Sequence, residues 1–189
     1  MKRQVRVLGI DDSPFTFESK RTLVVGVVSR LPMYVEGIMR TKCDVDGTDA
    51  NEAIADMVLR SRYREQLKVI MIDGVAVGGF NVVDIDRLYR DTGVACATVT
   101  RGLPDYGSME KALRAHFRDW EERIEVIRRH PLYRLGGRRS IYAAATGISI
   151  DDLEMIIEES TVSGSLPEPL RIAHLISSAM VRGESHGRA

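Results

Sequence analysis

The chain has 189 residues, 44% of them apolar, which suits a single globular domain over residues 1–189 with a sizeable core. Lysine plus arginine and aspartate plus glutamate number 27 each, so the overall basic excess typical of many nucleic-acid-binding proteins is missing. Two cysteines, Cys43 and Cys96, are too few for a disulfide framework and favour a reducing, cytoplasmic location. No apolar run is long enough to cross a bilayer, and we expect no membrane association.

The first part of the chain predicts an antiparallel meander of three strands. Apolar runs lie at residues 5–10 and within residues 21–30, and residues 33–42 alternate between two faces. Pro14 ends the first strand, because proline cannot donate to a β-ladder. Short turns between successive strands are typical of antiparallel pairing.

A helix is predicted to begin at Ala50, because Asp49 followed by Glu52 resembles a capping box. The next segment, residues 68–73, reads Lys-Val-Ile-Met-Ile-Asp and precedes a glycine. Four consecutive apolar residues of this kind predict a short strand that is buried on both faces.

The strand at 68–73 is followed by a predicted helix at 80–92 and a second buried strand at 94–99. This order predicts a right-handed parallel crossover. Further helices are expected at residues 108–129, 149–159 and 170–182, and a further strand at 140–145. We therefore predict an α/β fold with a ribonuclease-H-like mixed sheet, in which three antiparallel strands precede parallel strands and helices flank the sheet.

Carboxylates end two of the predicted strands, at Asp11 and Asp73, and a loop at 43–49 contains more of them. Ligands of open α/β sheets bind at the carboxyl ends of the strands. Magnesium takes oxygen ligands, and a pair of such ions can cleave a phosphodiester. The alternative for Asp73 is a helix cap or turn former after an ordinary strand. For three further aspartates we favour solvated caps: Asp12, Asp44 and Asp49.

Basic residues gather in one part of the sequence, beside a glycine pair: Arg128, Arg129, Arg134, Arg138 and Arg139. These side chains could contact phosphates, and glycine backbone can approach phosphates closely. A solvated basic face explains the cluster equally well. Trp120 lies in a helical apolar pattern and is expected in the core.

Four patches together resemble the archaeal endonuclease dU family, which is related to endonuclease V. Gly9-Ile10-Asp11 and Ile72-Asp73-Gly74 are similar to the two metal-aspartate strands of endonuclease V. Residues 32–37, Pro-Met-Tyr-Val-Glu-Gly, resemble its strand-separating wedge. Residues 166–174, Leu-Pro-Glu-Pro-Leu-Arg-Ile-Ala-His, are similar to its carboxy-terminal motif, and this last patch is long and specific.

The resemblance implies an endonuclease that uses Mg²⁺ or Mn²⁺ to cleave nucleic acid near a deaminated base, deoxyuridine or inosine. The implied substrate is DNA in preference to RNA, and the implied process is DNA repair, with no obligate protein partner. Asp11 and Asp73 would be metal ligands and Tyr34 would hold the strands apart. Arg171 and His174 would lie near the site, with His174 orienting water or contacting phosphate.

The chain departs from endonuclease V at two positions that bear on catalysis. The catalytic glutamate of endonuclease V falls at Cys43, and Asp46 is the nearest carboxylate that could replace it as catalytic residue and ligand. Glu36 stands where the wedge has proline, and its charge would repel phosphate unless it met a metal or a base edge. Gly37 and the arginines Arg138 and Arg139 complete the candidate nucleic-acid contacts.

Two other functions are compatible with these residues. One is a non-catalytic nucleic-acid-binding protein that kept the fold and lost the glutamate. The other is a hydrolase of a small phosphorylated metabolite that uses the same acidic cleft.

Overall fold

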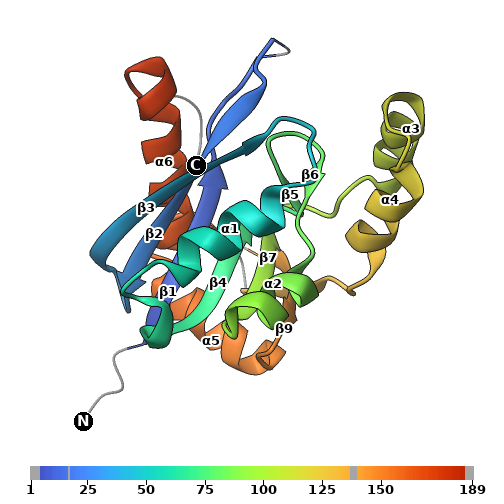
Figure 1. The fold of residues 1–189 in the computed structure, drawn as a ribbon. Coiled ribbons are helices and arrows are strands. Elements are labelled where there is room, and N and C mark those ends of the chain that lie inside the picture. Colours follow the sequence, from blue (N-terminus) through green and yellow to red (C-terminus); the bar gives the residue numbers. More distant parts are fainter. Residues whose placement is uncertain (1–4, 17, 137–139, 186–189) are drawn as a thin grey trace.

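The computed structural model describes residues 5–16, 18–136 and 140–185, and within them a seven-stranded mixed sheet lies between helices (Figure 1). Its strands run in the order β3-β2-β1-β4-β7-β9-β8. The strands are β1 (Arg6–Asp12), β2 (Arg21–Arg30), β3 (Tyr34–Asp44), β4 (Leu67–Asp73), β7 (Ala95–Thr100), β8 (Tyr133–Leu135) and β9 (Ile141–Thr146). The helices are α1 (Ala50–Leu59), α2 (Ile85–Thr92), α3 (Tyr106–His116), α4 (Trp120–Arg128), α5 (Ile150–Ser160) and α6 (Glu168–Arg182), with a short 3₁₀ turn η1 (Arg64–Gln66).

The strands run in the directions that the sequence predicted. β1, β2 and β3 form an antiparallel meander, and β1, β4 and β7 are parallel neighbours. β9 returns antiparallel to β7 and carries the short strand β8 at the sheet edge, which sequence analysis did not predict. Because β1 and β4 are parallel neighbours, their carboxyl ends lie at the same edge of the sheet.

The sheet is covered on both faces. On one face, Ile54 of α1 and Leu88 of α2 pack with sheet residues such as Ile70. On the other face, Leu153 of α5 and Leu170 of α6 pack with sheet residues such as Val69. No helix in the described ranges is long and apolar enough to span a membrane.

Helix α6 lies unusually close to strand β1. The contact is possible at Gly9, where an added Cβ would overlap the backbone of Pro169 and Leu170. A side chain at this position would therefore push the amino-terminal turn of α6 away from the sheet. Gly9 thus allows α6 to reach the carboxylates at the end of β1.

The helix predicted at 80–92 begins only at Ile85. Residues before it form a small hairpin, β5 (Ala76–Val77) with β6 (Asn81–Val82). Asp84 caps the helix, since its side chain accepts hydrogen bonds from the backbone N–H groups of Asp86 and Arg87. The predicted end is confirmed: Gly93 has a left-handed φ of 72°.

The single helix predicted at 108–129 is two helices, α3 and α4. The chain is extended at Phe117, where φ is −126° and ψ is 133°. The Phe117 ring packs edge-on against Phe80, with ring centroids 5.7 Å apart, and this distant contact takes the chain out of the helix. Trp120 packs partly buried against the apolar cluster of these helices, as predicted for a core residue.

The predicted start of α1 is confirmed, but the capping box does not form. Asp49 makes no side-chain bond to the amino-terminal turn. Its Oδ1 instead accepts hydrogen bonds from the Asp44 N–H and from Asn81 Nδ2. Asn81 Oδ1 accepts from the Ala50 N–H at 3.0 Å, so a residue 31 positions away caps this helix.

Candidate active site

Asp11 and Asp73 lie at the carboxyl ends of adjacent parallel strands. Ile10 of β1 pairs with Ile72 of β4, so the two aspartates follow in register. His174 of α6 completes the group, with its Nδ1 2.8 Å from Asp11 Oδ2. The structure therefore brings together three side chains that are 163 positions apart at the extremes.

The carboxylates of this group resist ionisation. Asp11 is 7% exposed, and burial followed by the charge of Asp73 raises its pKa to about 8. Burial also raises the pKa of Asp73, although the nearby Arg101 and His174 oppose the rise. Asp12 has a pKa raised to about 6, again mainly by burial. Adjacent buried carboxylates of this kind are typical of functional sites, because a bound cation restores their charged form.

The donor set fits a magnesium or manganese ion. Asp11 and Asp73 offer hard oxygen ligands, and Mg²⁺ is commonly held by one or two carboxylates with water and substrate phosphate completing its shell. Within the described part of the chain, no three histidine, cysteine or acidic side chains are grouped closely enough to hold a metal ion. The site thus fits an ion that shares its coordination with substrate, not one enclosed by protein.

Arg101 belongs to the site and was given no role in sequence analysis. It follows β7 directly, and its Nη2 lies 3.8 Å from Asp73 Oδ2. At this distance the two groups attract each other electrostatically. The sequence signal that could have identified Arg101 is a basic residue directly after the buried strand β7, which lies beside β4.

Asp46, the proposed replacement for the glutamate, bonds to the β5–β6 hairpin. Its Oδ1 accepts a hydrogen bond from the Phe80 N–H at 2.8 Å, and its backbone has a positive φ of 58°. Among the described residues no contact joins it to Asp11 or Asp73. Cys43, where the resemblance to endonuclease V leads one to expect the glutamate, is fully buried with a free thiol.

The wedge segment, residues 32–37, contains one strongly exposed aromatic residue. Tyr34 is 62% exposed, and Arg30 stacks over its ring at 4.8 Å. Glu36 instead turns inward, where Arg6 and Arg30 pair with its carboxylate at 2.5 and 3.1 Å. Gly37 lies against the ring of Tyr63, which an added Cβ would overlap. Tyr34 is therefore more exposed than its neighbours Met33 and Val35, which are 50% and 37% exposed.

The other basic candidates have partners or lie outside the described residues. Arg171 pairs with the buried Glu168 on the same helix, at 2.7 Å. Arg128 pairs with Glu110 at 2.8 Å and Arg129 with Asp84 at 2.7 Å, so this part of the basic cluster is neutralised. Arg138 and Arg139 lie outside the described residues.

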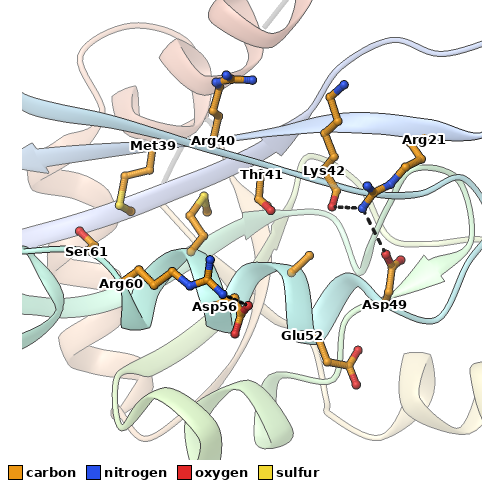
Figure 2. A pocket seen from close by; sticks show the side chains of 12 residues that line it. Arg21, Met39, Arg40, Thr41, Lys42, Asp49, Glu52, Asp56, Arg60 and Ser61 are labelled. Carbon is orange, nitrogen blue, oxygen red and sulfur yellow. Dashed lines mark hydrogen bonds and ion pairs between the residues drawn. The ribbon is translucent and has the colours of Figure 1, made fainter.

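An open groove of about 710 Å³ runs between β3 and α1, away from the carboxylates. Figure 2 shows Met39 and Thr41 pointing from the strand toward the helix, whereas Arg40 and Lys42 point away. Neither Asp11 nor Asp73 lines this groove. The candidate chemistry is therefore at the strand ends and not in the groove.

The mixed sheet, with paired aspartates at the ends of its central parallel strands, places the chain in the ribonuclease-H-like class. Endonuclease V of Ciona intestinalis, in complex with DNA that contains inosine, has this fold, with a TM-score of 0.64 at 14% identity over 97% of this chain and 88% of that one.

The family described as Endonuclease dU matches residues 3–181, and the chain belongs to that family. A UPF0215 protein of Thermococcus gammatolerans is 46% identical over 98% of this chain and 96% of its own. The crystal structure of a protein of unknown function from Archaeoglobus fulgidus has a TM-score of 0.85 and 37% identity, over 97% of this chain and 100% of that one. Family and fold together support a nuclease.

Proposed function

We propose that the protein is a divalent-metal-dependent endonuclease that cleaves a phosphodiester near a deaminated base, deoxyuridine or inosine, in DNA. The observation that carries the proposal is the position of Asp11 and Asp73 at the carboxyl ends of adjacent parallel strands, where two carboxylates can share a divalent cation. The family, and the inosine-containing DNA bound by the Ciona endonuclease V, support the substrate class. Removal of deaminated bases makes DNA repair the expected process.

In this proposal Asp11 and Asp73 hold Mg²⁺ or Mn²⁺, which when bound supplies Lewis-acid activation of water and neutralises the leaving oxygen. His174 is oriented by Asp11 through Nδ1, which leaves Nε2 for a water or a phosphate oxygen. Arg101 lies beside Asp73 and supplies a cation for a substrate phosphate. Asp46 has a structural role here, since its carboxylate is bonded to the Phe80 N–H.

The test is cleavage of a duplex oligonucleotide that carries one deoxyuridine or one inosine, with Mg²⁺ or Mn²⁺. We expect wild-type protein to nick the lesion strand and Asp73→Asn to abolish nicking, because the ligand charge is lost. Asp105→Asn is the matched control: Asp105 caps the exposed start of α3 and should be dispensable. Uncut strands across a panel of deaminated bases would contradict the proposal.

A non-catalytic nucleic-acid-binding protein is the alternative, and it would follow if the buried Cys43 stands where endonuclease V has its catalytic glutamate. Such a protein would bind lesion DNA with strong salt dependence and show no nicking with either metal.

A further inference from the structure

Arg123 of α4 is a buried cation, 8% exposed, whose guanidinium joins three carbonyl groups. Its Nη1 donates to the backbone oxygens of Asp46 at 3.1 Å, Gly47 at 3.0 Å and Phe80 at 2.6 Å. Its Nε donates to Asp119 Oδ2 at 3.0 Å. A buried guanidinium group needs hydrogen-bond partners of this kind. If the guanidinium is removed, the carbonyl groups lose their hydrogen-bond donor.

Arg123 thereby connects the loop before α1 to the β5–β6 hairpin. The same hairpin is bonded at two further points: Gly78 N–H donates to Asp12 Oδ2 at 3.0 Å, and its oxygen accepts from the Asp46 N–H at 2.7 Å. Asp12 adjoins Asp11, and the hairpin begins shortly after Asp73. The contacts of Arg123 therefore reach a hairpin that follows Asp73 closely in the chain and is bonded to Asp12.

The hairpin belongs to the core of α3 and α4. Val75, Phe80 and Val82 pack against an apolar cluster built around Leu113 and Ile124. We call the hairpin with α3 and α4 the outer lobe; its two helices lie at one side of the molecule in Figure 1. Arg123 bonds the lobe to the loop at 46–47, and it acts together with Asp46 Oδ1, which accepts from the Phe80 N–H, and Asn81 Nδ2, which donates to the Asp44 backbone oxygen.

We propose that Arg123 is a positioning residue that fixes the hairpin, residues 75–82, as one wall of the substrate site beside Asp73. The inference rests on the proposed function. Gly79 is exposed with φ of 83°, and the Asp46 carboxylate lies where a Cβ of Gly79 would be, so the tip of this wall packs closely against the loop at 46–47. The carboxylates themselves stand on the central strands and do not depend on Arg123.

The experiment is steady-state nicking of a lesion oligonucleotide by Arg123→Met and Arg123→Lys. We expect Arg123→Met to raise KM about tenfold with kcat within about threefold, because substrate binding is lost and the metal ligands stay in place. The Mg²⁺ concentration for half activity should not change. The KM of Arg123→Lys should lie between those of the wild type and Arg123→Met, because one ammonium group cannot reproduce the planar set of donors of a guanidinium group.

Arg114→Met is the matched control. Arg114 lies on α3 in the same lobe and stacks on the Trp120 ring at 4.3 Å, yet its side chain is 61% exposed. Its KM and kcat should equal those of the wild type.

An unchanged KM in folded Arg123→Met would overturn the inference, as would a fall in kcat with altered Mg²⁺ dependence. If Arg123→Met does not fold, Arg123→Lys and Asp119→Asn answer the same question. If wild-type protein nicks no lesion substrate, the proposed function fails, and amide hydrogen exchange decides about Arg123 alone. Arg123→Lys should then speed exchange at residues 78–81 and leave β4 unchanged; equal exchange at 78–81 would refute it.

Discussion

At the scale of one residue, the raised pKa of Asp11 makes the stability of the fold depend on pH. In the unfolded chain its carboxyl has a pKa near 3.8, and in the folded protein the pKa is about 8. A carboxyl group whose pKa is higher in the folded protein than in the unfolded chain favours folding most when it is protonated. Its contribution to the free energy of unfolding is therefore most favourable at a pH below the pKa of the unfolded chain. Stability is therefore lost progressively as the pH rises from about 4 to about 8.

Asp11→Asn should raise the free energy of unfolding at pH 8 without metal by on the order of 1–3 kcal/mol, because the buried charge is removed. The gain should shrink toward pH 4, where the wild-type carboxyl is protonated. The same variant should lose nicking activity. Denaturant unfolding with a chelator at both pH values measures the gain, and equal stability at pH 8 would contradict it.

Asp11 and Asp73 were proposed from strands that end on a carboxylate, and His174 from the resemblance of residues 166–174 to the carboxy-terminal motif of endonuclease V. Sequence analysis did not anticipate that Glu36 would be neutralised by arginines or that Asp46 would bond to Phe80. Arg6 lies 30 positions from Glu36, and Phe80 lies 34 positions from Asp46, so the proximity of each pair is created only by the tertiary fold.

At the scale of elements, the approach of α6 to β1 depends on Gly9. The approach places His174 beside Asp11 and allows Ser177 Oγ to donate to the backbone oxygen of Asp12 at 2.9 Å. The position of one helix relative to one strand thus determines the geometry of the candidate site.

Gly9→Ala should destabilise the protein by about 1–3 kcal/mol, the usual cost of overpacking, because its Cβ meets backbone that cannot move aside. It should also reduce nicking, since α6 carries His174. Gly102→Ala is the control, because nothing lies within 4 Å of a Cβ built there. Thermal unfolding compares the two, and similar midpoints would show that α6 can move without cost.

Element types were mostly predictable from the sequence, whereas interruptions of the helices were not. The apolar runs predicted β4 and β7, and the glycine at position 93 predicted the end of α2. The gap between α3 and α4 comes from the contact between Phe117 and Phe80, and the late start of α2 from pairing within the hairpin. Both are long-range interactions, which a helical apolar pattern does not reveal.

At the scale of the whole molecule, the wedge and the carboxylates lie at opposite ends of the sheet. Tyr34 pairs with Arg30, which pairs with Arg6 at the start of β1, whereas Asp11 is five residues further along. That separation is about 16 Å along the strand at the usual rise per residue. A ligand that contacts both must span this distance, as a nucleic-acid strand does.

Tyr34→Ala should therefore reduce cleavage of a lesion duplex and leave hydrolysis of a small phosphodiester, bis(p-nitrophenyl) phosphate, unchanged. Tyr133→Ala serves as control, because Tyr133 is similarly exposed on β8 at the far edge of the sheet. Parallel rate measurements on both substrates test the prediction. An equal loss on the small substrate would show that Tyr34 acts on the fold or the metal site.

The location of His174 on α6 has a consequence for biosynthesis. A ribosome delivers Asp11 and Asp73 long before residues 168–182, so a nascent chain holds both acidic side chains without the histidine. Val25 and Val27, which pack with Ala173 of that helix, also stay uncovered until then. Translation that stops early therefore yields a candidate site without its histidine and an exposed apolar surface that chaperones or proteases can recognise.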